Sequence, residues 1–218
     1  MIIPNAVMPI VICLFLGYLL GNLNGALTCS KLFHHEDIRE KGSGNAGLTN
    51  YFRTYGGWDA LGVILIDAGK AVLACFIGRW LFQAFSLNET EALRLGSMVF
   101  GGAVVIGHCF PVFYGFRGGK GILCCAALSA YMNIWVFLIL LAVFALTVLL
   151  SKHVSVGSLT ACIVYPFLFW LFFPQNVPVI IIAAITAALD IFMHRSNIAN
   201  LIHGTEPKFT FHSKEKQL

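Results

Sequence analysis

The sequence predicts an all-α polytopic membrane protein with seven transmembrane helices, an outside N-terminus and a cytoplasmic C-terminus. Three observations support this prediction. The 218 residues are 58% hydrophobic and only 11% charged, whereas a soluble domain carries about 25% charged residues. Apolar runs of spanning length recur along the chain without a linker. Lys and Arg collect in alternate loops, as in the cytoplasmic loops of membrane proteins. We therefore expect one integral membrane domain over residues 1–218.

The apolar runs give the order of the spans. The first, from 7 to 27, has no Lys or Arg ahead of it, which is the reverse of a signal peptide, so we expect a retained helix. The other runs are 60–85, 93–113, 122–131, 134–150, 156–173 and 177–193. Because the run at 122–131 is short, residues 122–150 are also compatible with one tilted helix, which gives six spans with both termini on the same side.

The basic residues favour seven spans. One set of loops then holds most of them: Lys31, Arg39, Lys41, Arg53, Arg117, Lys120, Lys152, Arg195, Lys208, Lys214 and Lys216. The opposite loops, SLNETEA, YMN and PQNVP, hold none, and only Lys70, Arg79 and Arg94 depart from the scheme. The polar segments 36–57, 114–121, 151–158 and 194–208 then all face the cytoplasm, where we expect them to surround one cavity.

The loop EKGSGNAGLTN, residues 40–50, is rich in small residues. Glycine reaches positive φ without strain, so the backbone amides of such a loop can surround an anion. A phosphate cradle is one interpretation, and a flexible connector between helices is the other.

A second loop, YGFRGGKG at 114–121, places an arginine and a lysine around a glycine pair at the start of a helix. Exposed amides at a helix start favour a phosphate. A nucleotide-binding Walker loop is excluded by spacing, because Tyr114 and Gly121 stand where it needs glycine and Ser or Thr. The alternative is a basic loop that only fixes the topology.

Three further features complete the residue pattern. The segment HRSNIANLIHGTEPKF combines His194, Arg195, Asn197 and Glu206 after the last apolar run. Asp67 and Lys70 share a helical face inside a span, as a structural ion pair or part of a site.

The seven cysteines lack C-x-x-C spacing, so we expect neither a disulfide framework nor a metal site. The net charge of +4 is too small to suggest a nucleic-acid partner.

Four blocks in order, GSGNAGLTN with RTYG, GHCFPVFYGFRGGKG, KHVSVGS, and HRSNI with GTE, resemble the bacterial membrane acyl-phosphate:glycerol-3-phosphate acyltransferases over nearly the whole chain. The resemblance implies transfer of a fatty acyl group from acyl phosphate to the 1-hydroxyl of glycerol 3-phosphate. The product is lysophosphatidic acid, the first step of phospholipid synthesis. It also implies a multi-pass protein of the cell membrane, an active site facing the cytoplasm, and no metal or other cofactor.

The same resemblance implies roles for particular residues. It places five in catalysis: Ser43, Arg53, Lys120, His194 and Asn197. It places others in substrate and phosphate binding: Gly42, Gly44, Asn45, Thr49, Asn50, Gly118, Gly119, Gly121, Ser155, Arg195 and Glu206. Asp67 and Lys70 are a possible supporting pair. Because acyl phosphate is already activated, the protein chiefly has to align two anions, and the departing phosphate oxygen takes the hydroxyl proton in our hypothesis.

The chain departs from the family pattern at Asn22, Leu48, Leu123, Cys124 and Asn200, where relatives carry other residues, including an arginine in place of Asn200. An inactive relative is therefore one alternative. A membrane transporter of a phosphorylated or organic anion is another, because glycine loops at half-helix ends also bind transported anions. No acyl-chain preference or oligomeric state follows from the sequence.

Overall fold

The computed structural model describes residues 6–208, so Lys214 and Lys216 of the predicted cytoplasmic tail lie outside the described residues. This part of the chain contains helices and no strands. They are α1 (Val7–Gly21), α2 (Gly25–His34), α3 (Leu48–Thr54), α4 (Ala60–Ala84), α5 (Thr90–Cys109), α6 (Ile122–Met132), α7 (Ile134–Ser151), α8 (Val154–Phe172), α9 (Val177–Met193) and α10 (Arg195–Ile202), with 3-10 turns at Ile38–Glu40 and Val112–Tyr114. The all-α prediction is confirmed.

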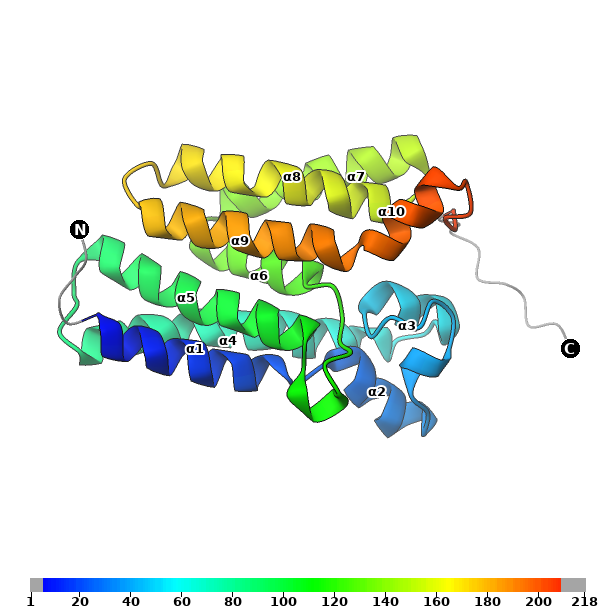
Figure 1. The fold of residues 1–218 in the computed structure, drawn as a ribbon, viewed down its shortest axis with the longest axis horizontal. Helices are drawn as coiled ribbons and strands as arrows, with labels where there is room; N and C mark the ends of the chain where they lie inside the picture. Colours follow the sequence, from blue (N-terminus) through cyan, green and yellow to red (C-terminus); the bar gives the residue numbers. More distant parts are fainter. Residues whose placement is uncertain (1–5, 209–218) are drawn as a thin grey trace, which may run out of the picture.

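The helices α1 and α4 to α9 run alternately in the two directions along one bundle (Figure 1). Each overlaps one of the apolar runs read from the sequence. Within residues 6–208, five stretches are long and apolar enough to cross a membrane, with α1 and α2 counted together as one of them, and α9 with α10, bent by 53°, makes a sixth. The 11 residues of α6 extend only about 16 Å, roughly half the hydrocarbon thickness of a bilayer. The separate α6 and α7 exclude a single helix over 122–150, while the seven-span count stays a prediction.

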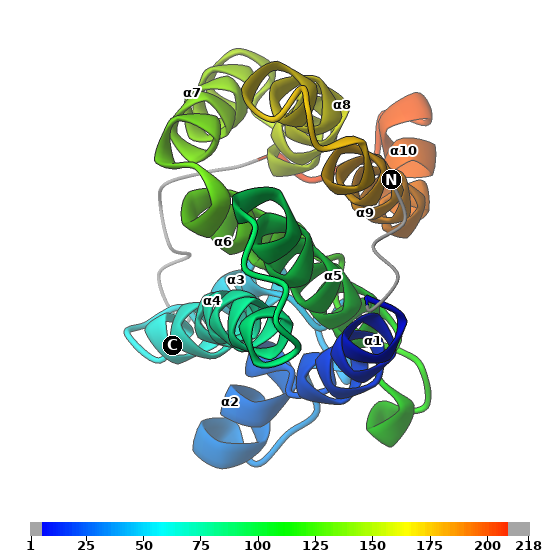
Figure 2. The same cartoon turned by 90° about the vertical axis from the view of Figure 1, so that its left-hand side faces the viewer.

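The central element is α5, which contacts α1, α4, α6 and α9 (Figure 2). Glycines allow its closest contacts. A Cβ atom on Gly96 would lie 2.6 Å from the carbonyl oxygen of Gly78 on α4, and one on Gly107 would lie 3.0 Å from Cα of Gly21 on α1. Such small-residue contacts let membrane helices pack backbone to backbone. These contacts hold α1 and α4 against α5, and α6 and α9 pack on α5 as well.

The first apolar run is broken between α1 and α2, where we expected one helix over 7–27. The Asn24 side chain caps α2 by accepting a backbone N–H hydrogen bond of 2.9 Å. The Lys70 ammonium donates to the carbonyl oxygens of Gly21 and Leu23, at 3.1 and 2.5 Å. Hydrocarbon offers no hydrogen-bond partner, so a break in a membrane helix needs such internal partners. This break was not predicted from the sequence, because the freed backbone groups are satisfied by the side chains of Asn24 and Lys70, and the Lys70 contact joins residues that are distant in the sequence.

Lys70 and Asp67 form a buried ion pair with Nζ and Oδ1 2.8 Å apart. The same carboxylate accepts a 3.0 Å hydrogen bond from Gly25 N. Nδ1 of His108 lies 3.3 Å from the carboxylate and 2.9 Å from Lys70 Nζ. Cys124 donates its thiol to the Asp67 carbonyl oxygen at 3.4 Å. The pair therefore connects α2, α4, α5 and α6, which supports its interpretation as a structural ion pair.

The Lys70→Met substitution should destabilise the protein by about 3–5 kcal/mol, because it leaves the Asp67 carboxylate buried without its ammonium. Thermal unfolding of the detergent-solubilised protein measures the effect. Lys152→Met is the control, since Lys152 is exposed, and the double variant Asp67→Asn/Lys70→Met should recover part of the loss. An unchanged midpoint in Lys70→Met would contradict this account of the helix break.

Candidate active site

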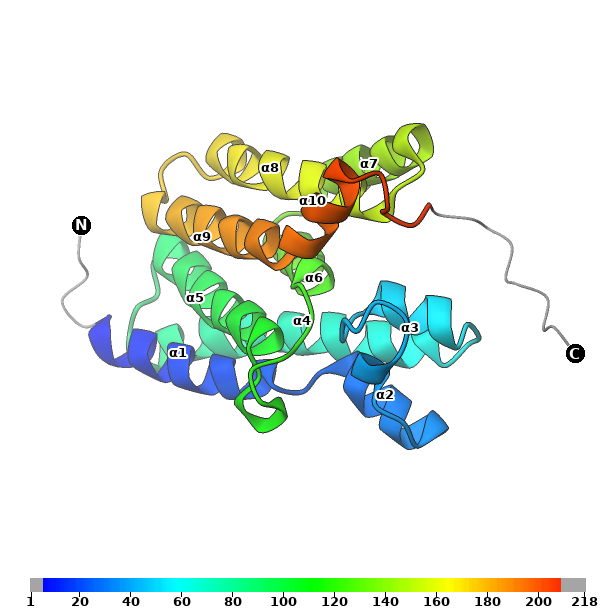
Figure 3. The ribbon, with the colours of Figure 1, turned by 45° about the vertical axis from the view of Figure 1, so that its right-hand side comes forward.

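A cavity of about 940 Å³ lies between α3, α10 and the start of α6, at the end of the bundle on the right in Figure 3. Residues from widely separated parts of the chain form its wall. Among the residues predicted from the sequence, the cavity is lined by Gly42, Ser43, Asn45, Thr49, Asn50, Arg53, Asp67, Lys120, Gly121, Ser155, His194, Asn197 and Glu206. The four polar segments therefore surround one space, as expected.

The 41–50 loop owes its shape to the Asn50 side chain. Its Oδ1 accepts a 2.8 Å hydrogen bond from Ser43 N. Its Nδ2 donates to the carbonyl oxygens of Ile38, Lys41 and Asn45, at 3.2, 3.0 and 3.0 Å. The two N–H groups of Asn50 are thus shared among three carbonyl oxygens, and together with the bond from Ser43 N they hold a loop that has little other regular structure. Asn50 therefore positions Ser43 at the cavity wall.

The helix α6 begins at the cavity wall. Its N-cap residue, Gly121, has φ +89°, and a Cβ atom there would collide with the Asp190 carboxylate. No side chain caps this helix start. The first amides of a helix have no partner within it, and Ile122 and Leu123 line the cavity. This end of α6 is therefore suited to bind an anionic group.

A hydrogen-bond network fixes the cation beside this helix start. The Lys120 ammonium donates to Asn197 Oδ1. The Asn197 amide in turn donates to Glu206 Oε1 at 2.8 Å, and the Asn200 amide to Glu206 Oε2 at 3.4 Å. Asn200, where the family pattern has an arginine, thus helps to hold the Glu206 carboxylate. The network ties the loop before α6 to α10 and the segment after it.

Two groups of this network have shifted pKa values. Partial burial, and to a smaller extent the neighbouring charge of Arg53, lower the pKa of Lys120 to about 8, although Glu206 opposes the shift. Burial raises the pKa of Glu206, but the nearby Ser155 hydroxyl, the Asn197 and Asn200 amides and the charge of Lys120 outweigh it and hold that pKa below its usual value. At neutral pH the cavity therefore contains the Lys120 cation beside the Glu206 anion.

His194 lies buried at the bend between α9 and α10. Its Nδ1 is 2.7 Å from the carbonyl oxygen of Asp190. A carbonyl oxygen only accepts hydrogen bonds, so we assign the proton to Nδ1. Nε2 of the neutral ring is then an acceptor that a hydroxyl group in the cavity can use.

The part of the cavity away from these groups is apolar. It passes between α6, α7 and α8 and is lined by Phe137, Leu140, Leu141, Phe144, Ala161 and Tyr165. Among the residues of α7, only Val136 and Leu140 are buried. This helix alone therefore separates much of the apolar cavity from the surroundings of the bundle.

Five predicted residues do not line the cavity. Gly118 and Gly119 are two of them, because their amides donate to the carbonyl oxygens of Cys109 and His108, at 3.2 and 3.1 Å. The glycine pair thus joins the loop to the end of α5. A Cβ atom on Gly119 would lie 2.8 Å from the Ala46 carbonyl oxygen, so the pair lets the two glycine-rich loops approach each other.

The other three are Gly44, Lys70 and Arg195. The Gly44 amide closes a turn onto the carbonyl oxygen of Lys41 at 2.9 Å, and Lys70 is buried in its ion pair. The exposed Arg195 guanidinium lies over the ring of Phe192, with 4.7 Å between its central carbon and the ring centroid. This placement does not support the expected contact between Arg195 and a phosphate.

Sequence reasoning missed Asp190. Within residues 6–208, the buried side-chain oxygens with no partner at normal hydrogen-bond distance belong to Ser155, Tyr165 and Asp190, and all three residues line the cavity. A buried polar atom normally has a partner, so these atoms mark where a bound molecule or water completes the wall. The signal was present in the sequence, because Asp190 is the one ionisable residue of the 177–193 run.

Comparisons with known proteins agree with this geometry. The family model described as glycerol-3-phosphate acyltransferase matches residues 11–204. The chain is 38% identical over 191 residues to a glycerol-3-phosphate acyltransferase of Finegoldia magna, covering 88% of this chain and 91% of the relative. It is also 38% identical over 198 residues to one of a Thermoanaerobacter species, covering 91% and 94%.

The fold is similar to that of a solved structure. The crystal structure of PlsY (YgiH), an integral membrane glycerol 3-phosphate acyltransferase in its glycerol 3-phosphate form, superposes with a TM-score of 0.80 at 30% identity. The match covers 92% of this chain and 96% of that one. The lysophosphatidic acid form gives a TM-score of 0.78 at 29% identity, covering 92% and 95%.

The Asp190→Ala substitution should raise the thermal midpoint of the solubilised protein. It removes an unpartnered carboxyl group, whose burial costs about 1–3 kcal/mol, and it leaves the empty volume open to the existing cavity. Asp190→Asn, which keeps an unpartnered polar group, is the matched control and should gain less. A lower midpoint for the alanine variant would mean that the carboxyl group has a stabilising partner.

Proposed function

This chain belongs to the glycerol-3-phosphate acyltransferase family, and we propose that its cavity transfers a fatty acyl group from acyl phosphate to the 1-hydroxyl of glycerol 3-phosphate. The observation that carries the proposal is the division of one cavity into two environments. Arg53, Lys120 and the start of α6 line its polar end, and apolar side chains line its other part. Acyl phosphate carries a charged phosphate group and an apolar acyl chain, so a single molecule matches both parts of the cavity.

The polar end is suited to two phosphate groups. Arg53 and Lys120 supply positive charge from different segments, and within the described residues Arg53 has no hydrogen bond or ion pair of its own to break. The open amides of α6 add donors without a net charge. Because two phosphates repel each other, neutralising both is the main requirement for bringing the substrates together. Ser43, placed by Asn50, is then available to stabilise charge on the carbonyl oxygen.

The apolar part is suited to the acyl chain. Its wall of aromatic and aliphatic side chains runs behind α7, so a chain lying there keeps its carbonyl group near the polar end. Burial of the chain contributes about 0.8 kcal/mol for each methylene group. The donor is thus anchored at both ends while its carbonyl carbon stays accessible.

In the transfer step, the 1-hydroxyl oxygen of glycerol 3-phosphate bonds to the acyl carbon, and the bond from that carbon to the phosphate oxygen breaks. Phosphate is an adequate leaving group without a covalent enzyme intermediate. The hydroxyl proton passes to the departing phosphate, so Nε2 of His194 is left to accept a hydrogen bond from the neighbouring 2-hydroxyl group and thereby orient glycerol 3-phosphate. Asn197 acts through Lys120, because its amide holds the ammonium in place.

We further propose that the described helices belong to one domain over residues 1–218, with seven spans and the cavity at the cytoplasmic face. The support is the distribution of charge: Lys41, Arg53 and Lys120 line the cavity, and Lys208 directly follows Pro207, which also lines it. Such residues accumulate on the cytoplasmic side. The transporter alternative is not favoured, because the family to which the chain belongs consists of acyltransferases.

Incubation of the purified protein with palmitoyl phosphate and labelled glycerol 3-phosphate should yield labelled lysophosphatidic acid and an equal amount of phosphate. Arg53→Gln should reduce kcat/KM about 10- to 100-fold, because it removes one charged contact to a phosphate. Arg117→Gln is the matched control, since Arg117 does not line the cavity. Absence of product with the wild-type protein, or equal loss in both variants, would contradict the proposal.

The pKa of Lys120 predicts a pH dependence of substrate binding. The ammonium is charged below about pH 8 and neutral above it, whereas a phosphate monoester is already a dianion above about pH 6. The KM for glycerol 3-phosphate should therefore rise severalfold between pH 7 and pH 9, by roughly tenfold at most. Lys120→Arg keeps its charge throughout and should show a flat KM. Parallel pH profiles for the two proteins would exclude Lys120 as the titrating group.

A further inference from the structure

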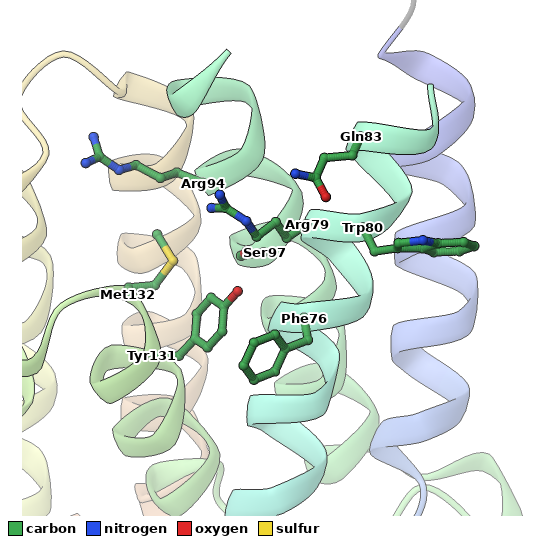
Figure 4. A pocket seen from close by; sticks show the side chains of 8 residues that line it. All are labelled: Phe76, Arg79, Trp80, Gln83, Arg94, Ser97, Tyr131 and Met132. Carbon is green, nitrogen blue, oxygen red and sulfur yellow. The ribbon is translucent and has the colours of Figure 1, made fainter. Parts of the chain in front are cut away.

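A second pocket, of about 470 Å³, lies at the other end of the bundle, where α4 ends and α5 begins (Figure 4). It is lined by Phe76, Arg79, Trp80, Gln83, Arg94, Ser97, Tyr131 and Met132. None of these residues lines the reaction cavity. Arg79 and Arg94 are also two of the three basic residues that depart from the charge pattern of the loops. The third, Lys70, is explained by its buried ion pair, whereas neither the ion pair nor the predicted reaction explains the two arginines.

The two arginines differ in their surroundings. Arg94 forms an ion pair with Glu91 and lies over the Phe173 ring, 5.3 Å from its centroid. Glu91 is engaged further by the Asn176 amide at 2.8 Å. Arg79 has no hydrogen bond or ion pair within residues 6–208. The Glu91 carboxylate offsets the charge of Arg94. The pocket therefore keeps one uncompensated positive charge, that of Arg79.

Neutral donors surround this charge. Figure 4 shows the Arg79 guanidinium, the Gln83 amide and the Tyr131 hydroxyl around the same space. Neither Gln83 nor Tyr131 makes a side-chain hydrogen bond to another described residue. Ser97 is committed to the carbonyl oxygen of Cys75 at 3.0 Å. Arg79, Gln83 and Tyr131 thus have unused donors that converge where a single anion can accept all of them.

The position of the pocket indicates what kind of anion it meets. It lies near the ends of apolar helices that are long enough to cross a membrane, at the depth where Trp and Tyr contact the lipid head groups. Trp80 is 62% exposed, and Phe76 is 57% exposed. Apolar walls beside a single net positive charge match a phosphodiester head group with its attached acyl chains.

We propose that this pocket binds the head group of an anionic phospholipid, with Arg79 contacting the phosphodiester and Gln83 and Tyr131 adding hydrogen bonds. The site lies at the membrane interface opposite the reaction cavity. It is therefore a lipid-binding site separate from the two substrates. The single positive charge predicts a preference for a lipid with one net negative charge, such as phosphatidylglycerol, over zwitterionic phosphatidylcholine.

Native mass spectrometry of the detergent-solubilised full chain, titrated with phosphatidylglycerol or phosphatidylcholine, tests the proposal. The wild-type protein should bind phosphatidylglycerol at least about tenfold more tightly, and Arg79→Gln should lose most of that preference. Arg79→Lys keeps the charge but loses the forked contact, so it should be intermediate. Lys152→Gln removes an exposed charge at the other end of the bundle and should change nothing.

Three outcomes would overturn the proposal. One is equal retention of the two lipids by the wild-type protein, which would indicate only a general lipid shell. Another is an unchanged preference in Arg79→Gln, which would mean that Arg79 merely extends to the interface. The third is release of phosphatidylglycerol by millimolar inorganic phosphate, which would indicate a site for soluble phosphate. If Arg79→Gln misfolds by its thermal midpoint, Tyr131→Phe and Gln83→Leu must each weaken phosphatidylglycerol binding about threefold.

Discussion

The arrangement depends on the buried Asp67–Lys70 ion pair, because it makes a broken helix possible inside an apolar bundle. A backbone break at membrane depth exposes carbonyl and amide groups that lipid cannot satisfy. Lys70 satisfies the carbonyls of Gly21 and Leu23, and Asp67 satisfies the first amide of α2. Beyond the break, α2 continues the span begun by α1, and the segment after α2 returns to the end of the bundle (Figure 1). There Ala46 of the glycine-rich loop contacts Gly119, shortly before α6 begins.

The same principle explains how the reaction cavity is built. Each irregular segment around it is held by one side chain with several partners: Asn50 for the 41–50 loop, and Asn197 with Glu206 for the segments near Lys120. These fixed contacts hold Lys120 and the 41–50 loop in place before any substrate arrives, so little of the binding energy is lost in ordering the loops. The unpartnered oxygens of Ser155, Tyr165 and Asp190 lie on α8 and α9, where these helices line the cavity.

Much of this could be predicted from the sequence, and the rest depended on contacts between distant residues. Composition and charge placed the helical runs, since spanning length and loop charge are local properties. The glycine loops and the tail segment were correctly brought to one cavity. The roles of Gly118 and Gly119 were not predictable, because a glycine can either expose its amide to a ligand or allow close packing. Here their amides bind carbonyls of α5. Arg195, the first residue of α10 after the 53° bend, is exposed and lies over the Phe192 ring, a contact that its position in the sequence does not predict.

The central claim is that cations from separate segments act on the same bound phosphates. It is tested most directly by a double-mutant cycle on glycerol 3-phosphate affinity, measured by titration calorimetry for Arg53→Gln, Lys120→Gln and the double variant. Arg53 is close enough to Lys120 to lower its pKa, so the account predicts that the loss in the double variant differs from the sum of the single losses by more than about 0.5 kcal/mol. Losses that add within that margin would contradict a shared site.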